Sequence, residues 1–199
     1  MLLYKKLNNF NLILASASPR RRQLLSDCGL QFTLAEKFEC DEHYPATMPC
    51  GEVAEYLSQL KSNAYPAPLQ PNDILLTADT VVIAEGNILG KPADREEALA
   101  MLRMLSGCKH TVVTGVTLRT TSRTHSFSVA SDVIFREITD EEIKYYIDKY
   151  KPFDKAGSYG VQEWIGYIGI EKIVGSYFNV MGLPVKRLYD ELKEFIKQL

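Results

Sequence analysis

The order of apolar and polar positions along the chain predicts a succession of short strands and amphipathic helices. Runs of apolar, β-branched and aromatic residues predict strands at residues 12–15, 32–35, 74–84, 112–118, 127–135 and 165–173. Apolar residues spaced three or four positions apart predict helices at residues 20–28, 52–64, 94–105, 139–150 and 184–199. Because strands and helices interleave along the chain, the pattern predicts an α/β fold.

Local signals mark where several of these helices begin and end. Asp94 and Thr139 each precede a helical segment and are followed three positions later by a glutamate, which is the spacing of a capping box. Gly29 is placed to end the first helix, and Pro184 is placed to open the last one. The polar residues 120–124 predict the turn of a hairpin.

Length and composition favour one domain. The chain has 199 residues, of which 46% are hydrophobic and 24% are charged, so it is long enough for one sizeable core and too short for two. The proline-rich stretch 65–71 joins a predicted helix to a predicted strand, and we interpret it as a connector inside one fold. We therefore expect a single domain over residues 1–199.

Charge and cysteine content argue against several function classes. The 23 basic and 25 acidic residues give a net charge of −2, so no overall field favours nucleic acid or an anionic membrane. The four cysteines and three histidines lack the spacing of a zinc site. No apolar run approaches the roughly 20 residues of a membrane span, and the run after Lys5 and Lys6 is too short for a signal peptide. We expect a cytoplasmic protein with reduced thiols that binds neither membranes nor nucleic acid.

The strongest chemical signal is the segment 16–22, in which small hydroxyl residues end a predicted strand and three arginines open a predicted helix. Amide groups at a helix N-terminus and guanidinium groups both bind phosphate oxygens. Positive charges at this end oppose the helix dipole, which indicates that an anion compensates them, although arginines there can also be simply solvated. The glycine and lysine spacing of a Walker-type loop is absent.

A second signal is Asp79, the carboxylate inside the apolar run 74–83. A buried, unpaired carboxylate costs several kcal/mol, so this residue needs a cation, strong donors or a solvent-open cleft. It is either a metal ligand or general base, or a strand aspartate satisfied by backbone amides. Lys91 in a Gly-Lys-Pro loop, Lys61 in a helix and Glu42 in a short acidic patch are weaker candidates, because each alone is typical of a solvated surface.

The irregular segment 152–162 contains two glycines and ends at Gln162. Such loops often line a site, although a plain connector has a similar composition. Together with His110 and the segments 14–21, 78–82, 90–92, 105–107 and 179–184, it closely resembles the Maf family. The matches run in family order from about residue 12 to residue 184 and cover nearly the whole chain.

The resemblance implies an elongated, two-lobed α/β fold with a mixed β-sheet and flanking helices, similar to inosine triphosphate pyrophosphatases. It implies a homodimer that hydrolyses nucleoside triphosphates to the monophosphate and pyrophosphate with a divalent metal cation, Mg²⁺ or Mn²⁺. By motif position, Asp79 corresponds to the family's proton acceptor, and its polar cleft residues correspond to Ser16, Arg21, Glu42, Lys61 and Lys91. From their chemistry we expect Ser16, Arg21, Lys61 and Lys91 to hold phosphate oxygens, and Glu42 and Asp79 to hold the metal.

Three positions indicate the branch of the family. Arg20, Thr80 and Gln162 match the specificity residues of the dTTP/UTP branch, whereas the related 7-methylguanosine-triphosphate branch typically carries Trp, Gln and Glu there. The chain departs from the family in an N-terminal extension, residues 1–11, and in the pair 163–164, which replaces a commonly glycine-rich pair. Modified pyrimidine nucleotides are further candidate substrates. Two alternatives stay open: a non-catalytic, nucleotide-sensing regulator of cell division, and a pyrophosphatase for a modified purine triphosphate.

Overall fold

The computed structural model describes residues 2–199, and these contain a seven-stranded mixed sheet. Its strands are β1 (Asn11–Leu14), β2 (Thr33–Leu34), β3 (Asp73–Ala84), β4 (Asn87–Leu89), β5 (Lys109–Arg119), β6 (Thr124–Phe135) and β7 (Ile170–Val174). The order is β2-β1-β3-β5-β6-β7, with β4 paired to β3. β1 runs parallel to β2 and β3, whereas β4 and β7 are antiparallel to their partners. The predicted α/β class with a mixed sheet is confirmed.

Eight α-helices and one 3₁₀ turn flank the strands in residues 2–199. They are α1 (Leu3–Leu7), α2 (Pro19–Asp27), α3 (Cys50–Ala64), α4 (Arg95–Leu105), α5 (Asp140–Tyr150), η1 (Ala156–Ser158), α6 (Trp164–Gly169), α7 (Tyr177–Met181) and α8 (Val185–Lys197). The capping box at Thr139 is confirmed, because its side chain and that of Glu142 each accept a backbone N–H of the other. No helix among the described residues has the length and apolar character to cross a membrane.

The chain divides into two compact units. Unit 1 comprises Met1–Asp79, Thr114–Val129 and Gly182–Leu199, and unit 2 comprises Thr80–Val113 and Ala130–Met181. Three of the four divisions fall inside β3, β5 and β6, so each of these strands contributes residues to both units, and the fourth directly follows α7.

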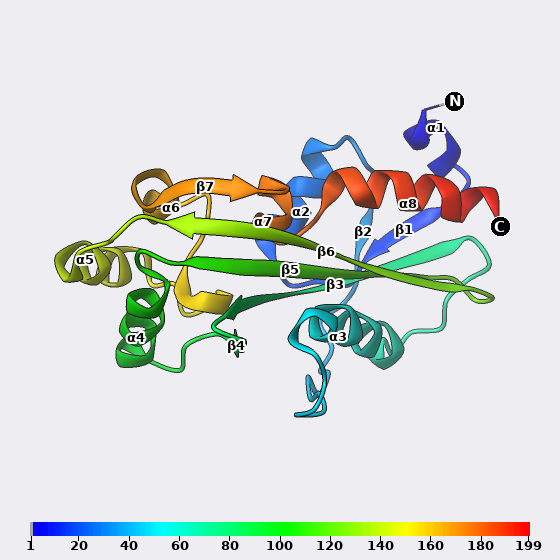
Figure 1. Cartoon of the computed structure of the whole chain (residues 1–199). Coiled ribbons are helices and arrows are strands. Elements are labelled where there is room, and N and C mark those ends of the chain that lie inside the picture. The colour runs from blue at the N-terminus through cyan, green and yellow to red at the C-terminus, as the bar shows by residue number, and fades with distance from the viewer. Residues whose placement is uncertain (1) are drawn as a thin grey trace. The chain divides into compact units, whose positions relative to one another are not determined.

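In unit 1, α3 and α8 cover opposite faces of the sheet (Figure 1). Gly115 on β5 allows α3 to approach closely, because a β-carbon there would overlap the backbone of Ala54. Ser58 of α3 then bonds Thr117 of β5, with 2.8 Å between the two hydroxyl oxygens. Its carbonyl accepts the Thr77 hydroxyl of β3 at 2.7 Å, and this second bond fixes the register of α3 over β3.

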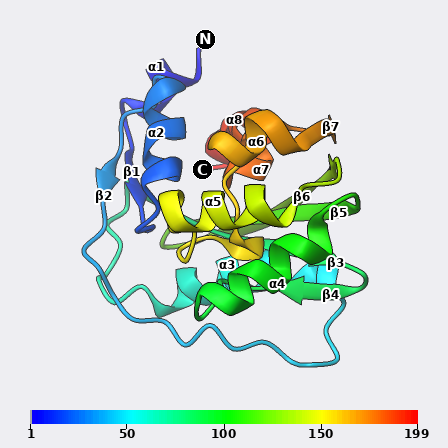
Figure 2. The same ribbon diagram turned by 90° about the vertical axis from the view of Figure 1, so that its left-hand side faces the viewer.

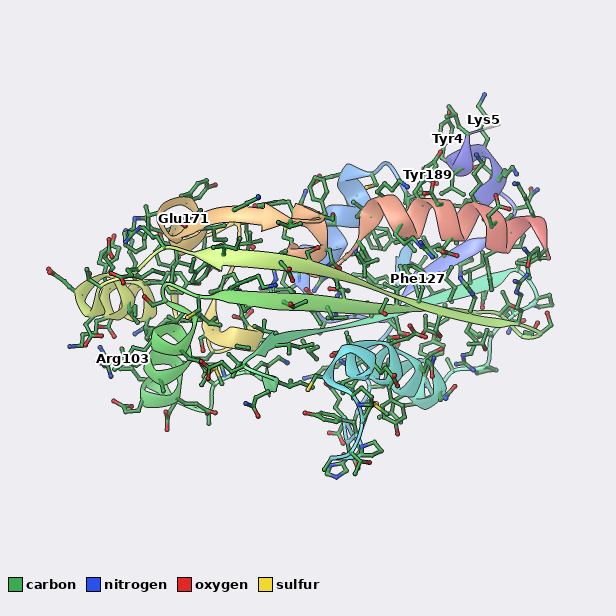
Figure 3. The ribbon with its side chains drawn as sticks, viewed as in Figure 1. Tyr4, Lys5, Arg103, Phe127, Glu171 and Tyr189 are labelled. Atoms are coloured by element: carbon green, nitrogen blue, oxygen red, sulfur yellow. The ribbon has the colours of Figure 1, made fainter. Side chains whose placement is uncertain are left out.

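The N-terminal segment packs in unit 1 through the short helix α1. The Leu3 N–H donates to the Tyr189 hydroxyl of α8 at 3.3 Å, and the Leu3 side chain is fully buried. Figure 3 shows Tyr4 and Lys5 of α1 close to Tyr189. No local pattern predicts α1, because its five residues are too few to show a helical period.

In unit 2, α4 and α5 lie side by side, as Figure 2 shows. Arg103 of α4 binds both carboxylate oxygens of Asp140 at the start of α5, and Arg95 binds Asp148 in the same way. The apolar faces of both helices contribute buried residues to a core that also contains Phe135 of β6. These ion pairs are exposed, so packing of the apolar faces supplies most of the stability.

The strand predicted at residues 165–173 is wrong in its first half. Residues up to Gly169 form α6, and only Ile170–Val174 form β7. Gly166 permits this helix, because a β-carbon there would overlap the carbonyl oxygen of Val161. A short run rich in apolar and aromatic residues fits a buried strand or a buried helix equally well, and tertiary packing selects the helix here.

His110 of β5 is buried in the core of unit 2. Its Nε2 lies 2.7 Å from the Tyr159 hydroxyl, and its ring packs edge-on against Phe135 with 5.1 Å between centroids. Its Nδ1 is buried and has no hydrogen-bond partner within residues 2–199. Burial lowers the pKa of His110 from 6.5 to about 4, against a smaller opposing effect of the Asp132 charge. The imidazole is therefore neutral and structural.

We expect His110 to make the stability of the protein depend on pH. The pKa of His110 is lower in the folded than in the unfolded chain. Its contribution to the free energy of unfolding is therefore fully present above pH 6.5 and is lost as the pH falls toward about 4. The wild type should lose about 3 kcal/mol relative to His110→Phe over this range. Urea unfolding of both proteins at several pH values measures the difference. Parallel pH profiles of the two proteins would show that His110 is not buried in the neutral form.

Candidate functional site

The candidate residues of unit 1 begin at the carboxyl end of β1. Leu14 pairs in register with Leu76 of the parallel strand β3, and the Ala15 N–H donates to the Leu76 carbonyl at 2.9 Å. β3 continues past this point to Ala84, so Ser16 and Asp79 both lie beyond the end of β1. The carboxyl ends of parallel strands are where α/β sheets commonly bind ligands.

The turn after β1 leads directly into α2. The Ser18 side chain caps the helix by accepting the Arg21 N–H at 3.5 Å, and Pro19 occupies the first helical position, where no N–H is needed. The predicted helix onset is confirmed within one residue. The capped N-terminus places the partly buried Arg20 and Arg21 next to the end of β1.

Arg21 is held in place from two sides. Its Nε donates to the Gly182 carbonyl at 2.8 Å, and one terminal nitrogen donates to the Ser16 hydroxyl at 3.2 Å. Burial lowers the pKa of Arg21, whereas the nearby charges of Asp79 and Glu42 raise it. A guanidinium group remains charged through such a change, so the turn carries a fixed, partly desolvated cation.

Lys61 joins the two predicted metal-binding carboxylates. Its Nζ donates to Asp79 Oδ1 and lies 3.1 Å from Glu42 Oε2. The side chains of Lys61 and Asp79 are 17% and 12% exposed, whereas that of Glu42 is 48% exposed. Asp79 therefore has a cation as its partner inside an apolar strand, which is one of the possibilities that its sequence position left open.

The position of Lys61 follows from the packing of α3. Thr77 and Asp79 are two positions apart on β3, so their side chains point to the same face of the sheet. Thr77 binds the Ser58 carbonyl, and Lys61, nearly one helical turn further along α3, reaches Asp79. Close packing of the helix on the sheet thus fixes the ammonium group against the carboxylate.

Cys40 lies near this cluster. Burial raises the pKa of the Cys40 thiol, Glu42 raises it further, and Lys61 opposes the rise. The thiol is thus protonated at neutral pH and is not an activated nucleophile. All four cysteines are free.

The remaining candidates, Thr80, Lys91 and Gln162, belong to unit 2. Side chains alternate along β3, so Thr80 faces away from the side of Asp79 and shares a face with Val82. A β-carbon at Gly157 would lie 3.1 Å from either methyl carbon of Val82, so the loop that leads to Gln162 packs against this face. The Gly157 N–H donates to the carbonyl of residue 90 at 3.0 Å, which ties the same loop to the turn of the exposed Lys91.

Gln162 itself is half-buried, and its Oε1 is buried without a hydrogen-bond partner within residues 2–199. A buried acceptor without a partner carries a free-energy cost, which a ligand donor can remove. The structure brings Ser16, Arg21, Glu42, Lys61 and Asp79 together in unit 1. In unit 2 it places Thr80, Lys91 and Gln162 on segments connected through the loop of Gly157.

Sequence comparison identifies curated relatives over nearly the full chain. A protein of Bacteroides thetaiotaomicron named dTTP/UTP pyrophosphatase is 52% identical over 188 residues, which are 94% of this chain and 97% of that protein. A relative with the same name from Parabacteroides distasonis is 49% identical over 97% of this chain and 100% of its own length. Another, from Porphyromonas gingivalis, is 51% identical over 95% of this chain and 96% of its own length.

Two solved structures are similar at low sequence identity. A nucleoside-triphosphatase, or dITP/XTP pyrophosphatase, from Mycobacterium abscessus is 12% identical, with a TM-score of 0.42, and the match covers 96% of this chain and 99% of that one. A HAM1 protein from Coxiella burnetii is 13% identical, with a TM-score of 0.45, and the match covers 93% of this chain and 99% of that one.

The profile of one protein family, described as Maf-like protein, matches residues 11–195. This range contains every candidate site residue predicted from the sequence. The family match and the identities of about one half over nearly the full length agree with the motifs found in the sequence. The chain belongs to the Maf family.

Proposed function

We propose that this protein is a nucleoside triphosphate pyrophosphatase that hydrolyses dTTP and UTP to the monophosphate and pyrophosphate, and modified pyrimidine nucleotides of the same kind. Relatives that are about half identical over nearly their full lengths carry the name dTTP/UTP pyrophosphatase. The observation that carries the proposal is the cluster of Lys61, Asp79 and Glu42 beside Arg21, because it combines cations for phosphate with carboxylates for water and metal.

Four residues are proposed to bind the triphosphate. Arg21 presents a guanidinium group whose orientation is fixed by Gly182 and Ser16. A planar guanidinium fork suits two phosphate oxygens, and fixed donors stabilise charge that develops in the transition state. The Ser16 hydroxyl and the Lys61 ammonium add further donors in unit 1, and Lys91 of unit 2 is assigned as a phosphate donor because the resemblance implies it.

The donor set in unit 1 fits a divalent metal cation, Mg²⁺ or Mn²⁺. Glu42 and Asp79 converge on one cationic group, the Lys61 ammonium, and carboxylate oxygens are the ligands that hard cations prefer. No group of three or more His, Cys, Asp or Glu side chains within residues 2–199 forms a ready-made metal site. Two carboxylates with phosphate and water as the other ligands are typical of Mg²⁺. A cation bound there would neutralise phosphate charge during hydrolysis.

We assign Asp79 as the proton acceptor. Its carboxylate, on β3 beyond the end of β1, is largely buried and held by Lys61, so it presents its remaining lone pairs in a fixed direction. A carboxylate in that position can orient and deprotonate the water that attacks the α-phosphorus. Lys61 pairs with this carboxylate and fixes its orientation.

Base selection is assigned to Arg20, Thr80 and Gln162, as the resemblance implies. Of these, Gln162 has a direct structural argument, because its buried Oε1 lacks a partner among the described residues. Thr80 lies on the face of β3 against which the loop before Gln162 packs.

We also infer that the protein is a cytoplasmic homodimer that binds neither nucleic acid nor membranes. Four free cysteines fit a reducing compartment, and the net charge of −2 provides no general attraction for polyanions. Light scattering after size exclusion tests the assembly, because a mass of one chain would contradict the dimer.

The bond that is cleaved tests the proposed reaction. Hydrolysis of dTTP in H₂¹⁸O with Mg²⁺ is expected to give dTMP and pyrophosphate, with the label in dTMP. Phosphorus NMR identifies the products, and mass spectrometry locates the label. Formation of dTDP and orthophosphate would contradict the proposal, because it requires cleavage between the β- and γ-phosphates.

Lys61→Met is expected to bind Mn²⁺ more tightly than the wild type in the absence of nucleotide, by about tenfold or about 1.4 kcal/mol. The Lys61 ammonium pairs with both carboxylates and so competes with an added cation. Titration calorimetry measures the affinity. The exposed Lys37, in the segment that leads to Glu42, provides the control variant Lys37→Met, for which no change is expected. Equal or weaker Mn²⁺ binding by Lys61→Met would remove Glu42 and Asp79 as a shared cation site.

A further inference from the structure

A buried network of charged and hydroxyl groups holds the loop of η1 in unit 2. Lys155 is 7% exposed and pairs with Glu163 at 3.0 Å and with the exposed Asp154 at 2.7 Å. The Tyr146 hydroxyl donates to the other carboxylate oxygen of Glu163 and accepts the Gly160 N–H at 3.0 Å. Burial, and then the neighbouring Glu163, raise the pKa of Tyr146, so its hydroxyl remains a donor. Both oxygens of this carboxylate therefore have fixed partners.

Gly160 brings this network into contact with Gln162. A β-carbon at Gly160 would lie 2.8 Å from Glu163 Cδ and 3.0 Å from both Gln162 Nε2 and Glu163 Oε2. The carboxamide nitrogen and the carboxylate therefore lie against the same backbone carbon. The negative charge of Glu163 favours the NH₂ group on its own side and turns the carbonyl oxygen of Gln162 away.

The direction of the carboxamide determines which base Gln162 can recognise. Uracil and thymine present an imide edge, in which an N–H donor lies next to a carbonyl acceptor. Cytosine presents an acceptor nitrogen at the same ring position, next to an amino donor. A carboxamide turned by half a rotation reverses its own donor and acceptor, so a freely rotating Gln162 matches either base. Discrimination therefore requires that the orientation of the carboxamide is fixed.

We propose that Glu163 is a positioning residue for base selection: held by Lys155 and Tyr146, it fixes Gln162 with Oε1 available for the imide N–H of uracil or thymine. The unpartnered, buried Oε1 supports this assignment, because an imide donor satisfies it and the acceptor nitrogen of cytosine does not. The inference rests on the proposed function and adds a chemical basis for selecting uracil and thymine over cytosine.

The test compares kcat/KM for dTTP and dCTP in the wild type, Glu163→Gln and Tyr146→Phe. The preference for dTTP is expected to fall by about tenfold or more in both variants, mainly through KM for dTTP, while kcat for dTTP changes less than about twofold. Tyr146→Phe alters no charge and keeps the test decisive if loss of the Lys155 partner unfolds Glu163→Gln. Tyr145→Phe is the control, because Tyr145 is exposed on the same helix and its hydroxyl accepts from Lys149.

A second comparison separates positioning from a general structural role. In a Gln162→Ala background, Glu163→Gln is expected to leave the dTTP to dCTP ratio unchanged, because Glu163 acts through the missing carboxamide. A wild-type ratio in folded Tyr146→Phe and Glu163→Gln, or a further fall of the ratio in the Gln162→Ala background, would overturn the inference. Absence of turnover by the wild type on either nucleotide would instead overturn the proposed function.

Discussion

Asp79→Asn is expected to lower kcat for dTTP by about 10³-fold, with a much smaller change in nucleotide affinity. Asparagine has nearly the same shape and still accepts from Lys61, but it cannot take a proton from water and contributes less negative charge to a metal. Single-turnover hydrolysis and equilibrium binding of dTTP measure the two quantities separately.

A second aspartate on β3 supplies the control for this variant. Asp73 is also buried, and its carboxylate accepts from the Gln70 N–H at 2.8 Å and from the Asn11 side chain at 3.0 Å. Asp73→Asn is expected to change stability but to keep wild-type turnover. Hydrolysis by Asp79→Asn within about tenfold of wild type would remove Asp79 as the proton acceptor. A cellular effect that persists in this variant without turnover would favour the nucleotide-sensing regulator.

Arg21→Met is expected to lower kcat/KM for dTTP by about 10²–10³-fold, through both KM and kcat. Methionine keeps the length of the side chain but removes the charge and every donor, including the bonds to Gly182 and Ser16. Arg21→Lys restores the charge without the planar fork and is expected to recover only part of the loss. Steady-state kinetics on dTTP and thermal melts of each variant test this.

Arg119 provides a matched control in unit 1. Like Arg21, it is half-buried and donates to a hydroxyl and a carbonyl, here the Ser62 Oγ at 3.0 Å and the Ser62 carbonyl at 2.5 Å. Arg119→Met should therefore lose stability as Arg21→Met does, but keep kcat/KM. Equal losses of activity in the two variants would indicate that Arg21 acts only through folding.

The sequence predicts the elements well where period and capping coincide. The capping box at Thr139 and the run that becomes β3 both lie within one or two residues of the observed bounds. The helix α6 was not predicted because its six residues are apolar and fit a strand equally well. Gly166 and Gly169 are needed because a β-carbon would clash with Val161 and Ile138, and these contacts exist only in the folded structure. The short helices α1 and α7 are likewise held by tertiary contacts rather than by a local signal.

In the candidate site, too, local signals identify some residues and tertiary contacts alone identify others. Asp79 could be found because a single carboxylate inside an apolar run needs a partner, but that partner, Lys61, is 18 positions away. A lysine in the last turn of a helix is already explained by the helix dipole, so it carries no signal of its own. Glu42 lies in a segment without regular structure, and no local pattern places it near Asp79.

The network around Glu163 was not predicted from the sequence. Lys155 follows an aspartate in a glycine-containing loop, which is typical of a solvated position, and only its pairing with Glu163 makes its burial tolerable. The signal in the sequence was Glu163, an isolated glutamate between Gln162 and an apolar segment. Because that segment was predicted as a strand, the position of Glu163 directly before the helix α6 was not recognised.

The proposed activity is tested most directly by pyrophosphate release from dTTP, UTP, CTP, GTP and 7-methyl-GTP by the wild-type protein, each with and without Mg²⁺ or Mn²⁺. We expect metal-dependent turnover of dTTP and UTP, with much slower release from the other three nucleotides. Preferred turnover of 7-methyl-GTP would contradict the assigned branch, and no release from any of the five would contradict the enzymatic function itself.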